Sequence, residues 1–294
     1  MTSTPPADAP DLYAVLGNPV EHSQSPFIHG EFARQTGERI DYVRVCCPLD
    51  GFAPALRRFA AEGDGVHRGR PRGCNVTVPF KFEVPRLAAR LSERATLAQA
   101  ANTLRFDTDG WYADNTDGVG LRRDVEHNAG MPLAGRRVLL IGAGGAAAGV
   151  LGPLLAAAPA VVTVANRTPD KAHALVQRHA GWARRHGATL NAAPLDAPGA
   201  GFDLVVNASA SSLAGQAVPV PATVLRVGTL AVDLMYGPAA TGFTGWAQAN
   251  GAIGRDGLGM LVEQAAEAFA LWRGVRPDTA PVLDALRARL SDRS

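Results

Sequence analysis

The sequence has few cysteines and lacks long apolar runs, and both features limit what the protein can be. Its 294 residues include three cysteines. Cys46 and Cys47 are adjacent, so an extended backbone would point them to opposite faces. We therefore expect free, mostly buried thiols in a reducing compartment, with no disulfide framework. No run reaches the roughly 18 uncharged apolar residues of a bilayer span, and residues 1–10 lack the basic and apolar regions of a signal peptide. A cytoplasmic protein without a membrane segment is expected.

A surplus of charge of one sign is also missing. The 29 basic residues nearly balance the 27 acidic ones, and they are scattered along the chain. This pattern gives no indication of a nucleic-acid partner. The seven histidines show no H-x-x-x-H or comparable ligand spacing, so no metal site is predicted. A small molecule is the expected partner.

The first part of the chain alternates predicted strands and helices. Strands of this kind, separated by helices of about ten residues, indicate βαβ units and a largely parallel sheet. An antiparallel ribbon around the tight turn at 107–110 is expected to close its edge. The predicted strands cover 12–20, 42–48 and 73–78, the ribbon covers 101–106 and 111–116, and helices are expected from Pro26, over 50–63 and over 80–92.

The second part begins a new α/β domain. A connecting helix is predicted over 118–130, and a fresh βα unit then starts near 136. Further strands are expected at 160–168, 202–209 and 230–236, spaced as in an open nucleotide-binding sheet. The sequence thus predicts a two-domain α/β protein.

A glycine-rich turn gives the best-defined local signal. In "VLLIGAGGAA", Gly142, Gly144 and Ala147 fit G-x-G-x-x-A after an apolar strand and before a helix. Gly142 allows the tight turn, Gly144 lets the backbone approach a pyrophosphate, and Ala147 permits close packing of helix on strand. The alternative is a glycine-rich turn without a ligand. The motif predicts a dinucleotide site.

The end of the next strand indicates which dinucleotide binds. In an NAD site this strand usually ends with an acidic residue that binds the ribose hydroxyls. Here it ends with Asn166, Arg167 and Thr168, and Lys171 follows one helical turn later. An arginine and a hydroxyl suit a 2′-phosphate, so NADP is predicted. Alternatively, Arg167 is solvated surface and Thr168 is an N-cap.

Lys81 is the candidate acid. It follows the strand of "NVTVPFK", and open α/β sheets bind ligands outside the carboxyl ends of their strands. Pro79 is expected to end that strand, so that Lys81 stands at a helix start. Reduction of a carbonyl by hydride needs a positioned proton donor. An exposed lysine at a helix start is the other interpretation.

Asp117 and a serine pair complete the candidates. Asp117, in "DNTDG", could hold the ammonium of Lys81 and accept a hydrogen bond from a substrate hydroxyl, although Asp before Gly is commonly a turn or cap residue. Ser23 and Ser25 would lie on one side of an extended segment and could bind a carboxylate, with N-capping as the alternative for at least one of them.

These residues together resemble the shikimate dehydrogenase family of NADP-dependent enzymes. The resemblance covers nearly the whole chain, in order and spacing. It includes "YAVLGNPVEHSQSPFIH", "NVTVPFK", "ANTL", "DNTDGVG", "IGAGGAA", "ANRT", "NAS" and "DGLGMLVEQAAEAF". It implies a first domain over 11–117 completed by helices over 257–294, a Rossmann domain over 118–256, and a cleft between the two.

The resemblance also implies roles for individual residues. Lys81 and Asp117 resemble the catalytic pair. Substrate contacts are implied for Ser23, Ser25, Thr77, Asn102, Asp117, Tyr236 and Gln264. Cofactor contacts are implied for Gly142, Ala143, Gly144, Gly145, Ala146, Asn166, Arg167, Thr168, Lys171, Leu234 and Gly257. Lys171 stands where the family often has arginine, which keeps the charge but loses a bidentate fork. Leu234 stands where the family often has methionine, and the two side chains are close enough in volume for the exchange to be tolerated.

The implied activity is the reversible reduction of 3-dehydroshikimate to shikimate by NADPH. A quinate/shikimate dehydrogenase is the nearest alternative, and the absence of an acid in "ANRT" together with Ser25 favours shikimate and NADP. Methylenetetrahydrofolate dehydrogenase is more distant, because a counterpart to its aromatic folate stack is not evident. A non-catalytic NADP-binding sensor is a further alternative. Loss of the lysine or the aspartate would have supported it, and both Lys81 and Asp117 are present. The family includes monomers and homodimers.

Overall fold

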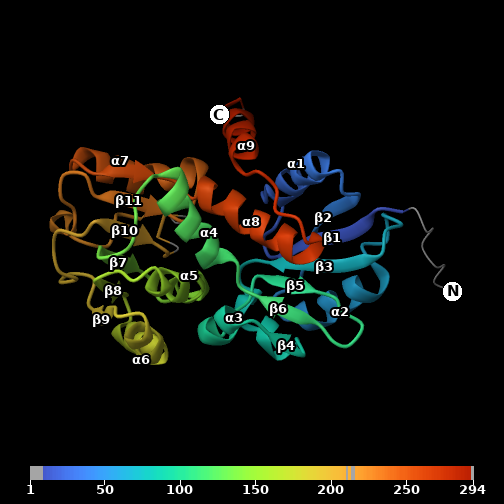
Figure 1. Cartoon of the computed structure of the whole chain (residues 1–294), viewed down its shortest axis with the longest axis horizontal. Coiled ribbons are helices and arrows are strands. Elements are labelled where there is room, and N and C mark those ends of the chain that lie inside the picture. The colour runs from blue at the N-terminus through green and yellow to red at the C-terminus, as the bar shows by residue number, and fades with distance from the viewer. Residues whose placement is uncertain (1–8, 210, 213–215, 293–294) are drawn as a thin grey trace. The chain divides into compact units, whose positions relative to one another are not determined.

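The computed structural model describes residues 9–209, 211, 212 and 216–292 of the chain (Figure 1). The described residues form two compact units. Unit 1 comprises the described residues up to Thr116 and those from Val262 onward, and unit 2 spans Asp117–Leu261. Each unit has its own sheet of six strands. The predicted α/β class is confirmed.

The sheet of unit 1 has the strand order β2-β1-β3-β5-β6-β4. Strands β1, β2 and β3 are parallel, whereas β5 pairs antiparallel with both β3 and β6, as the predicted ribbon requires. The strands are β1 (Asp11–Gly17), β2 (Ile40–Cys46), β3 (Pro71–Val76), β4 (Arg90–Leu91), β5 (Thr103–Arg105) and β6 (Tyr112–Asp114). The helices are α1 (Ser25–Thr36), α2 (Phe52–Glu62), α3 (Glu93–Ala98) and α9 (Ala280–Ser291), and α8 (Leu258–Arg273) begins in unit 2 and continues here.

Strand β1 is buried on both faces. Its side chains point alternately into two separate cores of unit 1. Leu12 and Leu16 pack in one cluster with Leu56 of α2. Tyr13 points the other way and stacks on Trp272 of α8, with 4.5 Å between ring centroids. Successive side chains of a strand lie on opposite faces, so an uninterrupted apolar run in β1 supplies both cores.

The second core of unit 1 contains a fully buried histidine. His29 of α1 is 0% exposed and stacks on Tyr42 with 4.3 Å between centroids and an interplanar angle of 4°. Burial disfavours the charged imidazolium and lowers the pKa of His29 from 6.5 to about 3. The imidazole of His29 is therefore neutral in the folded protein, and it takes up a proton more readily when the chain is unfolded.

We expect His29 to make the protein less stable in acid. The pKa of His29 is lower in the folded protein than in the unfolded chain. Its contribution to the free energy of unfolding is therefore complete above pH 6.5 and is lost as the pH falls toward 3. That loss amounts to about 3 kcal/mol between pH 6.5 and pH 4. The variant His29→Phe should lose less free energy of unfolding over this range, measured by urea denaturation at several pH values. An unchanged pH dependence would contradict the assignment, and exposed His173→Asn is the control.

The sheet of unit 2 is entirely parallel, with the order β12-β11-β10-β7-β8-β9. If β7 is counted as strand 1 and the sheet is read from β9 to β12, this is the 3-2-1-4-5-6 order of the dinucleotide-binding fold. The direction of the strand order reverses between the neighbouring strands β7 and β10. The strands are β7 (Arg137–Ile141), β8 (Val161–Ala165), β9 (Thr189–Ala193), β10 (Leu204–Asn207), β11 (Leu230–Asp233) and β12 (Ile253–Arg255). The helices are α4 (Asp117–Arg123), α5 (Gly145–Ala156), α6 (Pro169–Arg185) and α7 (Thr241–Ala249).

A buried ion pair anchors the segment after α4 within unit 2. Asp124 begins a π-helical turn, Asp124–Asn128, and its 0% exposed carboxylate accepts hydrogen bonds from Arg255 at 2.6 and 2.9 Å. Gly259 of α8 lies against this carboxylate, so closely that a Cβ there would overlap it. A buried carboxylate is stable only with a partner of opposite charge. Removal of Arg255 would leave the buried charge of Asp124 uncompensated.

The predicted helix over 80–92 is wrong. The structure has two short 3-10 helices, Phe80–Phe82 and Val84–Arg86, then β4 and α3. Proline lacks a backbone N–H, and Pro85 removes one that a continuous helix would use. The edge strands β9 and β12 were not predicted. Among the described residues, no helix is long and apolar enough to cross a bilayer.

Candidate functional site

The two serines lie side by side at the start of α1. The Ser23 hydroxyl donates to the Ser25 Oγ at 3.1 Å, and the Ser25 amide donates to the Ser23 Oγ at 3.3 Å. Arg44 of β2 donates to the Ser23 carbonyl at 2.6 and 3.0 Å and so fixes this turn. The N-cap position of α1 is Gln24, whose side chain makes no capping bond. The pair is thus a local two-hydroxyl cluster at the start of a helix.

Thr77 and Lys81 lie on the turn that follows β3. The strand ends at Val76, two residues before the predicted end at 78, so the prediction that Pro79 ends it is wrong. Lys81 is the middle residue of the 3-10 helix Phe80–Phe82. Phe80 is fully buried and stacks on Phe52 at 4.6 Å, which holds this turn against the core. Lys81 itself is half-buried, and its carbonyl accepts from the Ala101 amide at 2.9 Å.

Lys81 and Asn102 are therefore linked through the backbone of neighbouring segments. Asn102 follows Ala101 directly and is 3% exposed. The Val76 amide also donates to the Asn102 carbonyl at 2.8 Å. The end of β3, the 3-10 turn and the start of β5 thus form one region of unit 1.

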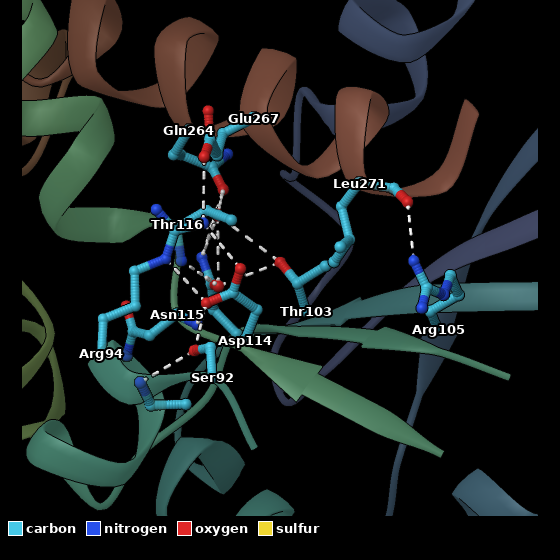
Figure 2. Close-up of polar contacts among 12 residues, drawn as sticks. Ser92, Arg94, Thr103, Arg105, Asp114, Asn115, Thr116, Gln264, Glu267 and Leu271 are labelled. Atoms are coloured by element: carbon cyan, nitrogen blue, oxygen red, sulfur yellow. Dashed lines mark hydrogen bonds and ion pairs between the residues drawn. The ribbon is translucent and has the colours of Figure 1, made fainter. Parts of the chain in front are cut away.

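Asn102, Thr116 and Gln264 form a buried cluster in this region. The Asn102 Nδ2 donates to the Thr116 Oγ1 at 3.0 Å and to the Gln264 Oε1 at 3.3 Å. The Thr116 hydroxyl lies 3.3 Å from the same Gln264 oxygen. Figure 2 shows Gln264 of α8 directed toward Thr116, with Thr103 of β5 beside them. Helix α8 therefore returns to unit 1 and completes a cluster of amides and hydroxyls.

A network of ion pairs supports the same cluster. Arg94 of α3 donates to the Asp114 carboxylate at 2.6 and 2.7 Å and to Glu267 of α8 at 3.0 Å (Figure 2). These bonds hold the pKa of Asp114 below its usual value although burial raises it. Asp114 also accepts from the Asn115 amide at 2.7 Å. The segment before Thr116 is thereby tied to α3 and α8.

Asp117 follows Thr116 directly and is the first residue of α4. It is 4% exposed, and its place at the start of the helix is also the one that the turn or cap interpretation gives it. Gly118 lies so close to the Gly149 carbonyl and to Pro153 of α5 that a Cβ would overlap both. The start of α4 is therefore fixed within unit 2 by close helix packing.

The glycine motif of unit 2 has the local geometry of a dinucleotide turn. Gly142 follows β7 with φ +112°, and a Cβ there would lie 3.0 Å from the Ala208 carbonyl oxygen. Gly144 is the N-cap of α5, and a Cβ on it would meet no atom within 4 Å. Ala147 is fully buried in α5. The turn leaves open space over Gly144, next to the N-terminus of a 12-residue helix, where a phosphate is favoured.

The end of β8 presents its polar residues to solvent. Arg167, Thr168 and Lys171 are exposed, and the Asn166 side chain donates to the Thr168 carbonyl at 2.9 Å. Thr168 occupies the N-cap position of α6, but its hydroxyl makes no capping bond. The hydroxyl is therefore not used as a side-chain cap. No acidic residue stands at Asn166, Arg167 or Thr168, where a carboxylate would bind ribose hydroxyls.

Leu234, Tyr236 and Gly257 lie in neighbouring loops after β11 and β12. The Gly257 amide donates to the Met235 carbonyl at 2.8 Å, and a Cβ on Gly257 would overlap the Leu234 carbonyl. Sequence reasoning missed Asp233, a buried residue that supports this loop by accepting from the Met235 amide at 2.9 Å. Burial raises the pKa of Asp233. An acid in the last position of an apolar strand was the signal in the sequence.

The order of unit 2 and its glycine turn define a dinucleotide-binding domain of an α/β protein. Residues 15–104 match the shikimate dehydrogenase substrate binding domain, 124–214 match shikimate/quinate 5-dehydrogenase, and 257–287 match the shikimate 5′-dehydrogenase C-terminal domain.

Relatives of known name match the chain over nearly its full length. It is 65% identical to a shikimate dehydrogenase (NADP(+)) of Methylibium petroleiphilum, with 96% of each chain covered. It is 62% identical to that of Paracidovorax citrulli, over 99% of this chain and 100% of the relative. A Thermus thermophilus shikimate 5-dehydrogenase in complex with NADP(H) and shikimate has a TM-score of 0.80 and 32% identity, covering 95% of this chain and 99% of that one. The chain belongs to the shikimate dehydrogenase family.

Proposed function

We propose that the protein catalyses the reversible reduction of 3-dehydroshikimate to shikimate with NADPH. The observation that carries the proposal is the buried Asn102–Thr116–Gln264 cluster in the same unit as Lys81 and the serine pair. Amides and hydroxyls of this kind suit a ring that bears several hydroxyls, and paired hydroxyls suit a carboxylate. Shikimate combines both groups.

Each residue then has a role in binding or proton transfer. Ser23 and Ser25 bind the carboxylate. The ring hydroxyls are held by Thr77, Asn102, Asp117 and Gln264, and Tyr236 packs over the ring. Lys81 donates the proton to the oxygen of the reduced carbonyl, and Asp117 fixes the hydroxyl geometry. Such orientation of reactants can contribute roughly 7–11 kcal/mol to catalysis.

Unit 2 has residues that fit NADP. The segment from Gly142 to Ala146 holds the pyrophosphate at the start of α5, where open space lies over Gly144. Asn166, Arg167, Thr168 and Lys171 bind the 2′-phosphate, while Leu234 and Gly257 border the nicotinamide. NADPH, when bound, supplies the hydride. The absence of an acid at the end of β8 supports NADP over NAD.

We expect Arg167→Ala to weaken NADP binding selectively. Hydrogen bonds to a charged group contribute roughly 1.5–3 kcal/mol, so the KM for NADP should rise about 10- to 100-fold. The KM for NAD should stay within about two-fold, since NAD lacks the phosphate that Arg167 would bind. Steady-state kinetics with both cofactors measure the ratio. Arg178→Ala, which removes an exposed arginine of α6, serves as the control. Equal losses with NAD and NADP would refute the phosphate contact.

The activity itself is tested by following the absorbance of NADPH after addition of 3-dehydroshikimate, because oxidation of the cofactor reports hydride transfer directly. Rapid loss of NADPH supports the proposal. Binding of NADPH without turnover would instead favour a sensor.

We propose that the enzyme is cytoplasmic. Its oligomeric state can be measured by light scattering.

A further inference from the structure

The last residues of β10 and β11 form a buried polar pair at the carboxyl edge of the sheet of unit 2. Asn207 ends β10 and is 1% exposed, and Asp233 ends β11 and is 0% exposed. The two are register partners in the parallel sheet, and the Asn207 Nδ2 donates to the Asp233 Oδ2 at 3.1 Å. The Ser212 hydroxyl donates to the same Oδ2 and accepts from the Asn207 Nδ2 at 2.9 Å. These polar groups therefore satisfy one another within the fold.

Main-chain amides on either side determine which atom of this pair donates. The Ser209 amide donates to the Asn207 Oδ1 at 3.2 Å, so the Asn207 Nδ2 must face Asp233. The Met235 amide donates to the Asp233 Oδ1 at 2.9 Å. Both of these main-chain groups can only donate. Each oxygen of the Asp233 carboxylate thus faces an obligatory donor, and neither can be exchanged for a donor without loss of a bond.

The pair lies between two segments that the proposed function assigns to NADP. On the β10 side, the Ala208 carbonyl oxygen would lie 3.0 Å from a Cβ on Gly142, in the turn proposed for the pyrophosphate. On the β11 side, the carboxylate holds Met235, which directly follows Leu234. The Met235 carbonyl in turn accepts from the Gly257 amide at 2.8 Å. Hydrogen bonds thus connect the end of β10 with the loops after β11 and β12, here called the nicotinamide loops.

We propose that the Asp233 carboxylate is a positioning group that fixes the nicotinamide loops relative to the pyrophosphate turn. The inference rests on the proposed NADP site, and it gives Asp233 no contact with cofactor or substrate. A dinucleotide binds at the carboxyl ends of the strands where the strand order reverses, between β7 and β10 (Figure 1). Its nicotinamide half therefore depends on the position of these loops, whereas its adenosine half is held at the turn and at the end of β8.

Asp233→Asn tests this role, because asparagine keeps the shape and replaces one acceptor by a donor. The new Nδ2 must face either the Asn207 Nδ2 or the Met235 amide, so one bond is lost in both orientations. Isothermal titration should show about 10-fold weaker binding of NADP, as expected for one lost hydrogen bond. Binding of 2′-phospho-ADP-ribose, which lacks the nicotinamide, should stay within about two-fold, since the helix start that binds its pyrophosphate is unchanged. Equal effects on both ligands would overturn the proposal.

Exchange of the two residues provides a rescue. Asn207→Asp alone places two carboxylates face to face and should weaken NADP binding at least as much as Asp233→Asn does. In the double variant Asn207→Asp/Asp233→Asn, donor and acceptor exchange places, and the Ser209 and Met235 amides keep their acceptors. The Kd for NADP should return to within about three-fold of the wild type. A double variant that binds NADP as weakly as Asp233→Asn would contradict the positioning role.

Asp203→Asn is the matched control for loss of a buried carboxylate. Asp203 is 7% exposed, directly precedes β10 and accepts from the Arg137 amide at 2.8 Å, at the opposite edge of the same sheet. Its variant should lower the melting temperature about as much as Asp233→Asn, with unchanged binding of both ligands. If Asp203→Asn weakened NADP binding equally, lost stability and not loop position would explain both variants.

Turnover separates this proposal from the proposed function. The kcat for shikimate oxidation should fall in Asp233→Asn and recover in the double variant, because hydride transfer needs an oriented nicotinamide. A wild type that binds NADP without oxidising shikimate would refute the proposed function. An Asp233→Asn variant that keeps the affinity of the wild type for NADP would refute the positioning role instead.

Discussion

Replacement of Lys81 by alanine should reduce kcat about 10²- to 10⁴-fold, the usual contribution of a positioned general acid. The KM for shikimate should change only a few-fold, because the proton is needed in the transition state more than in the ground state. Lys81 lies on a 3-10 turn held by the buried ring of Phe80, and its backbone is bonded to the segment that carries Asn102. Steady-state kinetics in the direction of shikimate oxidation measure both constants.

Arg86→Ala provides the comparison for Lys81→Ala. Arg86 is an exposed cation in the next 3-10 helix, so its removal changes the same net charge and leaves the proposed acid in place. Its kcat should remain near that of the wild type. If Lys81→Ala kept its turnover within a few-fold of the wild type, another group would have to donate the proton.

Asp117→Asn should lower kcat about 10²-fold, with a smaller rise in the KM for shikimate. The variant keeps the shape of the side chain but removes the charge that would hold a protonated lysine and accept from a ring hydroxyl. A hydrogen bond to a charged group contributes roughly 1.5–3 kcal/mol, and about 1.36 kcal/mol corresponds to a ten-fold change in rate. The same kinetic assay as for Lys81 is suitable. Asp117 is 4% exposed, so thermal unfolding should be recorded alongside.

Asp203→Asn separates catalysis from folding in this experiment. Asp203 is 7% exposed, precedes β10 and accepts from the Arg137 amide at 2.8 Å, at the amino end of the sheet of unit 2. Arg226 also pairs with it. Its variant should be less stable and retain kcat. Equal effects of Asp117→Asn and Asp203→Asn on kcat would show that loss of a buried charge, and not catalysis, explains both.

The sequence was most informative where local chemistry determines the backbone. Gly142 has φ +112°, a conformation that side chains rarely adopt, so a glycine motif after an apolar strand indicated its turn directly. The strands around it were predicted from their apolar runs and their spacing. The helix over 80–92 was wrong because its apolar spacing resembled a helix, while Pro85 and the buried Phe80 favour two short 3-10 turns.

The site was predicted by residue type more completely than by geometry. Ser23, Ser25 and Lys81 were identified as candidates from local patterns, and Asn102 and Gln264 came from the resemblance. The bonds of the buried cluster join Asn102 to Thr116 and to Gln264, pairs separated by 14 and 162 positions in the sequence. Such contacts depend on strand order and on the return of α8, which neither periodicity nor spacing contains.

The central claim is that the protein interconverts shikimate and 3-dehydroshikimate with NADP. The most direct test compares initial rates for shikimate and quinate with NADP and with NAD, using the full-length protein at one pH. We expect shikimate with NADP to give the highest kcat/KM of the four pairs. A preference for quinate with NAD would contradict the account, because neither Ser25 nor the acid-free end of β8 would then have the role proposed for it.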